Sequence, residues 1–321
     1  MPHELKGDEG YVFTSFGKQS YLRDVIVAVD ALRRFDTVRP VALYCSEEHA
    51  NELQKLAFRE WFTKIVILPQ ENQSIIGFKH QLYRFMPFTC NMYLDSDMIW
   101  CRNPDPVWYS MRPFGFTLTG NKSADIFFGA PKSFGISPHI LFRRRQRTLR
   151  RFGLTHLYRV QTGLMFARDE QLTREVCEQA TAFLHRMDET HFTSRTNEKK
   201  RSLESCEWSL GMAVSHLGLH LMPWFNGYES LQLDYIRYLT HHNADFTKVA
   251  CKYYCNPFIY GLRGIKTLWV HKLLKSLFWA LPRSNDHIWV TPYLLHFGWL
   301  HEKEVFEAYA ERRWTQLTQG G

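Results

Sequence analysis

The sequence contains no apolar run near the roughly 20 residues that a membrane-spanning helix needs, and it has no internal repeat or low-complexity segment. Its opening residues, MPHELKGDEG, are polar and acidic, unlike the apolar core of a signal peptide. These absences argue against an integral membrane protein, a secreted protein and a repeat array. We expect a cytoplasmic protein that is soluble or held peripherally on a membrane surface.

Cysteines are few and poorly placed for a metal site. Among the seven, only Cys251 and Cys255 are closely spaced, and no second Cys or His pair completes a zinc site with them. An odd number of cysteines without a secretory signal favours reduced thiols. The sequence therefore predicts neither a zinc site nor a disulfide framework.

The composition is that of an ordinary globular protein. Hydrophobic residues make up 45% and charged residues 22% of the 321 residues, so a sizeable core is expected. The length suggests about two domains, but an α/β enzyme of this size often forms one elaborated unit. We expect a single domain over 1–321, composed of a first half, 1–110, and a less regular second half, 111–321.

Short apolar segments alternate with helical periodicity along the first half. We expect strands at residues 11–15, 41–44, 64–68 and 92–94, and helices at 22–35, from 47 onward with Ser46 as N-cap, and across 78–85. This alternation is typical of a parallel, doubly wound sheet. Ligands of such sheets bind beyond the carboxyl ends of the strands.

The second half gives weaker signals. We expect strands at 114–119, 126–129, 163–167 and 220–222, and helices at 169–187 and 207–214. The polar and basic stretch near 192–205 predicts a mobile loop.

Two carboxylates mark the end of the fourth predicted strand. Asp95 and Asp97 follow an apolar segment, and a turn at 103–106 comes soon after. A hard divalent cation takes oxygen ligands and can bridge the phosphates of a nucleoside diphosphate. It then stabilises the charge that builds on a departing nucleotide. The pair therefore predicts a metal and diphosphate site; the alternative is a turn whose aspartates cap backbone amides.

The segments around 78–82, 93–97 and 103–104 resemble nucleotide-diphospho-sugar transferases of the GT-A fold, in the pattern of glycosyltransferase families 8 and 77. The resemblance implies a mixed, mainly parallel sheet flanked by helices, with a helical C-terminal elaboration. It also implies a hexosyltransferase that uses Mn²⁺ or Mg²⁺. The implied donor is a UDP-hexose or UDP-HexNAc, and the acceptor a hydroxyl of a glycan, glycolipid or protein, with retention at the anomeric carbon.

The resemblance also assigns residues to the nucleotide-sugar. The end of the first strand, where Thr14, Ser15 and Phe16 lie, corresponds to the contact with nucleobase and ribose. Lys79 corresponds to a basic residue near the donor phosphates, next to Asp95 and Ser96 in the expected site. Within the two halves, 1–110 would bind the nucleotide and 111–321 the sugar and acceptor.

Two catalytic candidates come from the second half. Gln161, before Gly163, stands where the family has an Asn that lines the sugar pocket. Glu207 stands where relatives carry an acidic residue at the donor sugar or acceptor. Its alternative role is that of a first-turn carboxylate that interacts with the helix dipole.

The segment that contains His296 and Gly298 resembles the late His-x-x-Gly element of the family, although only one residue separates the two here. By this resemblance His296 is the third metal ligand beside Asp95 and Asp97, and imidazole joins oxygen ligands around Mn²⁺. Gly298 would let the backbone approach the phosphates, and Lys303 would approach the diphosphate.

The net charge of +8 is concentrated in the arginine run Arg143–Arg151. Such a run is either a solvated helix face or a contact for an anionic surface, such as lipid headgroups. No nucleic-acid-binding motif accompanies it, so no nucleic acid is expected as a partner. Two other functions compete with sugar transfer: a haloacid-dehalogenase-type Mg²⁺-dependent phosphatase, and a binding module for anionic surfaces or nucleic acid based on this run.

Overall fold

The computed structural model describes residues 8–121, 124, 128, 136–192, 204–223, 231–254, 267–278, 287–298 and 302–319. Most of the loop predicted near 192–205 and most of the strand predicted at 126–129 lie outside the described residues. Within the described part, no helix is both long enough and apolar enough to span a bilayer.

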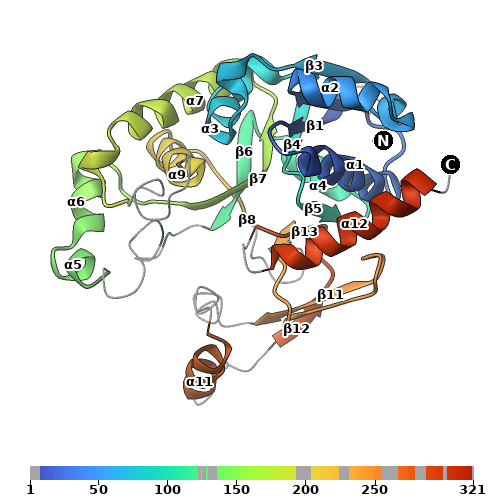
Figure 1. The fold of residues 1–321 in the computed structure, drawn as a ribbon. Coiled ribbons are helices and arrows are strands. Elements are labelled where there is room, and N and C mark those ends of the chain that lie inside the picture. Colours follow the sequence, from blue (N-terminus) through green and yellow to red (C-terminus); the bar gives the residue numbers. More distant parts are fainter. Residues whose placement is uncertain are drawn as a thin grey trace.

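A seven-stranded sheet forms the centre of the molecule (Figure 1), in the order β3-β2-β1-β4-β7-β6-β8. Its strands are β1 (Glu9–Ser15), β2 (Val41–Cys45), β3 (Lys64–Ile67), β4 (Cys90–Leu94), β6 (Phe116–Asn121), β7 (Arg159–Ala167) and β8 (Met222–Pro223). The first four strands are mutually parallel, as the alternation of strands and helices predicts. Strand β7 is antiparallel to both β4 and β6, so the sheet is mixed and mainly parallel.

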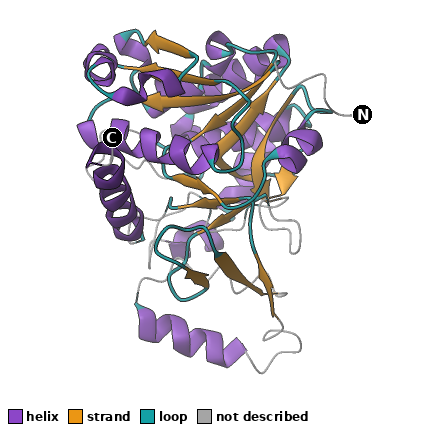
Figure 2. Ribbon diagram, turned by 90° about the vertical axis from the view of Figure 1, so that its right-hand side faces the viewer, coloured by secondary structure: helices purple, strands orange, loops and turns teal. Residues whose placement is uncertain are grey.

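Helices cover both faces of this sheet (Figures 1 and 2). Tyr11 and Phe13 of β1 pack on one face with α1 (Gln19–Arg33), α2 (Glu47–Gln54) and α4 (Asp105–Met111). Val12 packs on the other face with α3 (Ile75–Lys79), α7 (Glu170–His185) and α9 (Cys206–His216). Successive strand residues thus enter two separate cores, because strand side chains alternate between faces.

Two local predictions need correction. The helix expected across 78–85 is two pieces, α3 and the 3₁₀ turn η3 (Leu82–Phe85). Ser74 caps α3 by accepting a hydrogen bond from Gly77 N–H, and the helix ends at His80. The chain at 103–106 is not a simple turn but the start of α4, where a proline fits because the first helical N–H groups need no partner. Further 3₁₀ turns are η1 (Ala57–Trp61), η2 (Gln70–Asn72) and η5 (Met187–Glu189).

A second, three-stranded sheet brings distant segments together. It consists of β5 (Met98–Trp100), β13 (Leu294–His296) and β9 (Gln232–Asp234), with β13 in the middle. The register places His296 opposite Met98 on one side and opposite Asp234 on the other. The residue after Asp97 therefore pairs directly with His296.

The remaining elements extend the second half. A third sheet contains β10 (Thr240–His242), β11 (Val249–Tyr254) and β12 (His287–Val290). Helix α12 (Lys303–Gln319) packs against α1, and α11 (Leu268–Phe278) lies at the end of the molecule farthest from the main sheet (Figures 1 and 2). Helices α5 (Ile136–Leu141) and α6 (Arg144–Arg151) form a corner at the edge of the molecule.

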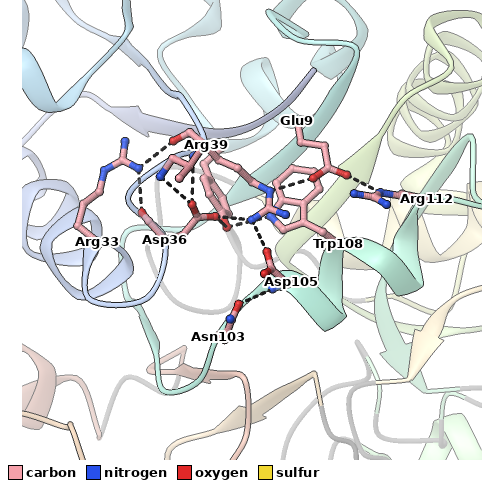
Figure 3. Close-up of polar contacts among 10 residues, drawn as sticks. Glu9, Arg33, Asp36, Arg39, Asn103, Asp105, Trp108 and Arg112 are labelled. Atoms are coloured by element: carbon pink, nitrogen blue, oxygen red, sulfur yellow. Dashed lines mark hydrogen bonds and ion pairs between the residues drawn. The ribbon is translucent and has the colours of Figure 1, made fainter. Parts of the chain in front are cut away.

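A buried ion cluster anchors the amino end of β1 (Figure 3). The Arg39 guanidinium donates to Glu9 at 2.9 Å, to Asp36 at 2.6 Å and to Asp105 at 2.8 Å, and Glu9 also accepts from Arg112. Glu9, Asp36 and Arg39 are all buried. The cluster joins β1, the loop after α1 and the start of α4, at the opposite end of β1 from Ser15.

Candidate functional site

The backbone around the acidic pair is fixed by two sheets. The Asp95 N–H donates to the Gly163 carbonyl of β7 at 2.8 Å, and the Phe297 N–H donates to the Asp97 carbonyl at 3.0 Å. Asp95 is thus held at the carboxyl end of β4 in the main sheet, and Asp97 is held next to β5 in the small sheet. Because both residues are hydrogen-bonded to neighbouring strands, the short connection between β4 and β5 holds the two carboxylates in a fixed position.

Asp95, Asp97 and His296 form a candidate metal centre. Each offers a ligand atom, and these atoms lie within 4.8 Å of one another. Asp97 is 16% exposed and Asp95 28%, whereas the His296 side chain is 4% exposed. The structure thus brings together the three residues that the sequence proposed as ligands.

The orientation of the His296 ring is set by a carboxylate that the sequence did not reveal. His296 Nδ1 lies 3.0 Å from Oδ1 of Asp234, whose side chain is also buried. An ionised carboxylate only accepts hydrogen bonds, so Nδ1 carries the hydrogen and Nε2 faces Asp97. Burial lowers the pKa of His296, but the hydrogen bond to Asp234 and the charge of Asp97 outweigh it and raise the pKa above its usual value.

The residues present fit a divalent cation. His296 Nε2 lies 3.6 Å from Asp97 Oδ1, which is close enough for both atoms to bind one ion through bonds of about 2.1 Å. A metal-ligating histidine usually donates its other ring N–H to a carboxylate, as His296 does to Asp234. Carboxylate oxygens with one imidazole suit ions such as Mn²⁺.

Two lysines neutralise the carboxylates. Lys79 Nζ, which is buried, lies 2.8 Å from Asp95 Oδ1 and donates to the Thr162 carbonyl at 3.0 Å. Lys303 Nζ donates to Asp97 Oδ2 at 2.9 Å. Burial lowers the pKa of each ammonium, but the adjacent carboxylate raises it above its ordinary value, so both lysines stay charged. For Asp97 the effects have the opposite sign: burial alone would raise its pKa, but the neighbouring His296 and Lys303 outweigh burial and lower the pKa below its usual range.

Gln161 and the nearby glycines also contact His296. Gln161 Nε2 lies 2.9 Å from Nδ1 of the ring and 3.3 Å from Nε2; because Nδ1 donates to Asp234, the amide N–H can donate only to Nε2. Its Oε1 accepts a hydrogen bond from Gly163 N–H. A Cβ on Gly298 would overlap the His296 ring. Gly298 therefore leaves room for the imidazole, a role that the sequence did not indicate.

Glu207 lies in the first turn of α9, near the lysine side of the site. The Ser205 hydroxyl caps this helix by accepting from Glu207 N–H at 3.3 Å. The neighbouring Cys206 Sγ lies 3.4 Å from Thr162 Oγ1, which in turn lies 3.3 Å from Lys79 Nζ. The position suits both roles considered for Glu207, that of a sugar contact and that of a first-turn carboxylate.

The candidates for the nucleoside lie at the carboxyl end of β1. The Ser15 hydroxyl is buried and lies 2.8 Å from His49 Nδ1, so it is already engaged within the protein. Thr14 Oγ1 lies 3.3 Å from the Tyr93 hydroxyl, which donates to Asp95 at 2.7 Å. Phe16 is half-buried, as is Ser96 between the two aspartates.

No protein-family model matches the sequence, and no curated protein matches it either. Among solved structures, the chain is similar to the galactosyltransferase LgtC in complex with donor and acceptor sugar analogs, with 11% identity and a TM-score of 0.50 over 96% of this chain and 95% of that one. The fold is GT-A.

Two other glycosyltransferase structures are similar at lower scores. The glycosyltransferase GlyE of Streptococcus pneumoniae TIGR4 is 12% identical, with a TM-score of 0.47 over 97% of this chain. The chain spans 63% of the length of GlyE. Mouse xyloside xylosyltransferase 1, in its apo form, is 15% identical, with a TM-score of 0.44 over 70% of this chain and 87% of that one.

Proposed function

We propose that this protein is a metal-dependent glycosyltransferase that moves a sugar from a nucleotide-sugar, a UDP-hexose or UDP-HexNAc, to a hydroxyl acceptor. The observation that carries the proposal is the convergence of Asp95, Asp97 and His296 at the carboxyl edge of a GT-A sheet. Ligands of open α/β sheets bind at this edge. The phosphatase alternative loses its support, because the GT-A fold places the acidic pair after the fourth strand, beside an antiparallel neighbour.

In this proposal Asp95, Asp97 and His296 hold Mn²⁺ or Mg²⁺. A bound cation would supply charge stabilisation on the diphosphate as the sugar departs. Asp234 keeps the His296 Nε2 directed at that position. Lys79 and Lys303 add fixed positive charge on either side of the acidic pair, where a leaving diphosphate gathers negative charge.

The rest of the donor is assigned by position. The nucleoside would lie at the end of β1, against Thr14, Ser15 and Phe16, with Ser96 and Gly298 near the phosphates. The sugar would lie toward Gln161 and Glu207, from β7 and the first turn of α9. Residues 1–110 would bind the nucleotide, and 111–321 the sugar and an acceptor hydroxyl of a glycan, glycolipid or protein. The arrangement is proposed to retain the anomeric configuration.

UDP release tests the proposal. The protein is incubated with UDP-glucose, UDP-galactose and UDP-GlcNAc in the presence of Mn²⁺, and UDP is measured with and without a panel of sugar acceptors. We expect release with at least one donor and its loss on removal of Mn²⁺ by a chelator. Asp97→Asn should lower the rate by at least about 100-fold, because a metal ligand is lost.

Asp188→Asn is the matched control, since it makes the same chemical change at an exposed position in η5. It should retain the full rate. The proposal fails if no donor is hydrolysed or transferred and Asp97→Asn leaves nucleotide binding unchanged.

A further inference from the structure

The net positive charge of this protein is confined to one segment. Residues 126–168 contain nine Lys or Arg and no Asp or Glu, whereas the rest of the chain has 31 basic and 32 acidic residues. The whole net charge of +8 is therefore carried by a stretch that includes α5 and α6. Charge so concentrated creates a local field that an evenly distributed excess would not.

Helix α6 exposes four of its five arginines, while Arg145 is half-buried. Its inner side is attached through Thr148, which is buried and lies 3.1 Å from His191 Nδ1, and through Phe152, which packs edge-on against Phe183 of α7. The outward arc, by helical geometry, is formed by arginines that are all exposed: Arg144, Arg147, Arg150 and Arg151. The body thus fixes one side of α6 and leaves a basic stripe on the other.

Three arginines of the stripe lack carboxylate partners among the described residues, and the fourth, Arg151, donates to the backbone carbonyl of Glu189 at 3.2 Å. Among the residues that the structure describes, Arg143, Arg144, Arg147 and Arg150 form no ion pair with an acidic side chain. Exposed arginines elsewhere, such as Arg174 and Arg186, do pair with neighbouring glutamates. The stripe therefore keeps its charge available for an external anion.

Exposed apolar side chains stand directly beside the stripe. Ile140 is 51% exposed, Leu141 77% and Phe142 54%, and they end α5 and lead into Arg143 at the corner. Consecutive large apolar residues at this exposure are unusual on a soluble surface. An interfacial contact with a bilayer uses this combination, since apolar side chains enter the headgroup region while basic side chains meet anionic lipid.

We propose that the corner formed by Ile140–Arg151 docks the protein on an anionic lipid bilayer. The arginine stripe meets the headgroups, and Leu141 and Phe142 enter the interface. The aliphatic pair Ile140 and Leu141 favours a bilayer over a nucleic acid, because single strands are bound by aromatic stacking and phosphate contacts. This docking is independent of the donor site, which lies on other elements.

Vesicle flotation with the full-length chain tests the proposal. Vesicles of phosphatidylcholine containing ~30% phosphatidylserine should bind the protein at low salt, and pure phosphatidylcholine should not. Replacing Arg144, Arg147, Arg150 and Arg151 by Gln should weaken binding by more than about 100-fold. Leu141→Ser with Phe142→Ser should weaken it by about 10-fold or more at unchanged charge.

A control variant carries the same charge change at four exposed sites elsewhere, namely K55Q, K64Q, R84Q and K248Q. It should bind vesicles as the unmodified protein does, and all variants should melt at the same temperature. The proposal is overturned if the unmodified protein ignores anionic vesicles. It is also overturned if the arginine variant binds like the control, or if the stripe binds a polyadenylate RNA while vesicles remain unbound.

Discussion

Gly298→Ala should damage the candidate metal centre without unfolding the protein. A Cβ at this position would overlap Cε1 of His296 and lie 2.8 Å from Nε2 and 2.9 Å from Nδ1. Non-bonded atoms of this size keep about 3.5 Å, so the ring must move by more than about 0.6 Å. The hydrogen bond from Nδ1 to Asp234 spans 3.0 Å, and such a movement breaks it or misdirects Nε2.

The expected loss follows from the role of the ring. Misorienting a histidine ligand typically lowers metal affinity by about 10–100-fold, which corresponds to about 1.4–2.8 kcal/mol. Titration with Mn²⁺, with free ion followed by electron paramagnetic resonance, measures this affinity directly. Thermal unfolding shows whether the variant is folded.

Gly115→Ala is the matched control. Its Cβ would be crowded as well, at 3.0 Å from Asp169 Cβ and from Leu172 Cδ2. Gly115 lies just before β6, and the strand register places it beside the amino end of β4, whereas the acidic pair follows the carboxyl end. The control should bind Mn²⁺ like the unmodified protein. If Gly298→Ala binds Mn²⁺ within about 3-fold of the unmodified protein, the ring is not held as the structure indicates.

Three further predictions concern the ligand shell and the fold. Asp234→Ala should weaken Mn²⁺ binding by about 10–100-fold while the protein stays folded, and an unchanged titration would remove Asp234 from the site. Arg39→Met removes the ion-pair partner of buried Asp36 and one of the two partners of buried Glu9, which keeps Arg112, so urea unfolding should show a loss of about 3–5 kcal/mol, against under about 1 kcal/mol for Lys55→Met on the surface. Burial lowers the pKa of His80 to about 4 and that of His191 to about 3, so the folded state favours the neutral form of both rings. Their contribution to the free energy of unfolding is therefore complete above pH ~6.5, the unfolded pKa, and is lost as pH falls toward the folded values. Between pH 7 and pH 4, the free energy of unfolding of His80→Asn should fall by about 3 kcal/mol less than that of the unmodified protein. An equal fall in both proteins would contradict the lowered pKa of His80.

The first half of the fold was predictable because its signals are local. Strands 11–15, 41–44, 64–68 and 92–94 each form a compact apolar segment, and each appears as a parallel strand. The parallel order follows from the helices between them. The cap at Ser46 is equally local, since it needs only a hydroxyl before a helix.

The second half depends on pairings that no short window contains. Strand β9 has only three residues, and Asp234 matters because β9 pairs with β13, some 60 residues later. Nothing in the sequence around Asp234 signals this pairing. The antiparallel direction of β7 is also set by its neighbours rather than by its own residues. His296 was proposed from a resemblance, and its placement beside Met98 comes from the sheet register.

The position of a bound cation tests the proposed metal centre most directly. Crystals of the protein grown with UDP and Mn²⁺ would give an anomalous difference map at the manganese edge. We expect one peak in bonding contact with Asp97 and His296, next to Asp95, with the UDP diphosphate on it. A peak away from these residues, or UDP bound elsewhere on the sheet, would contradict it.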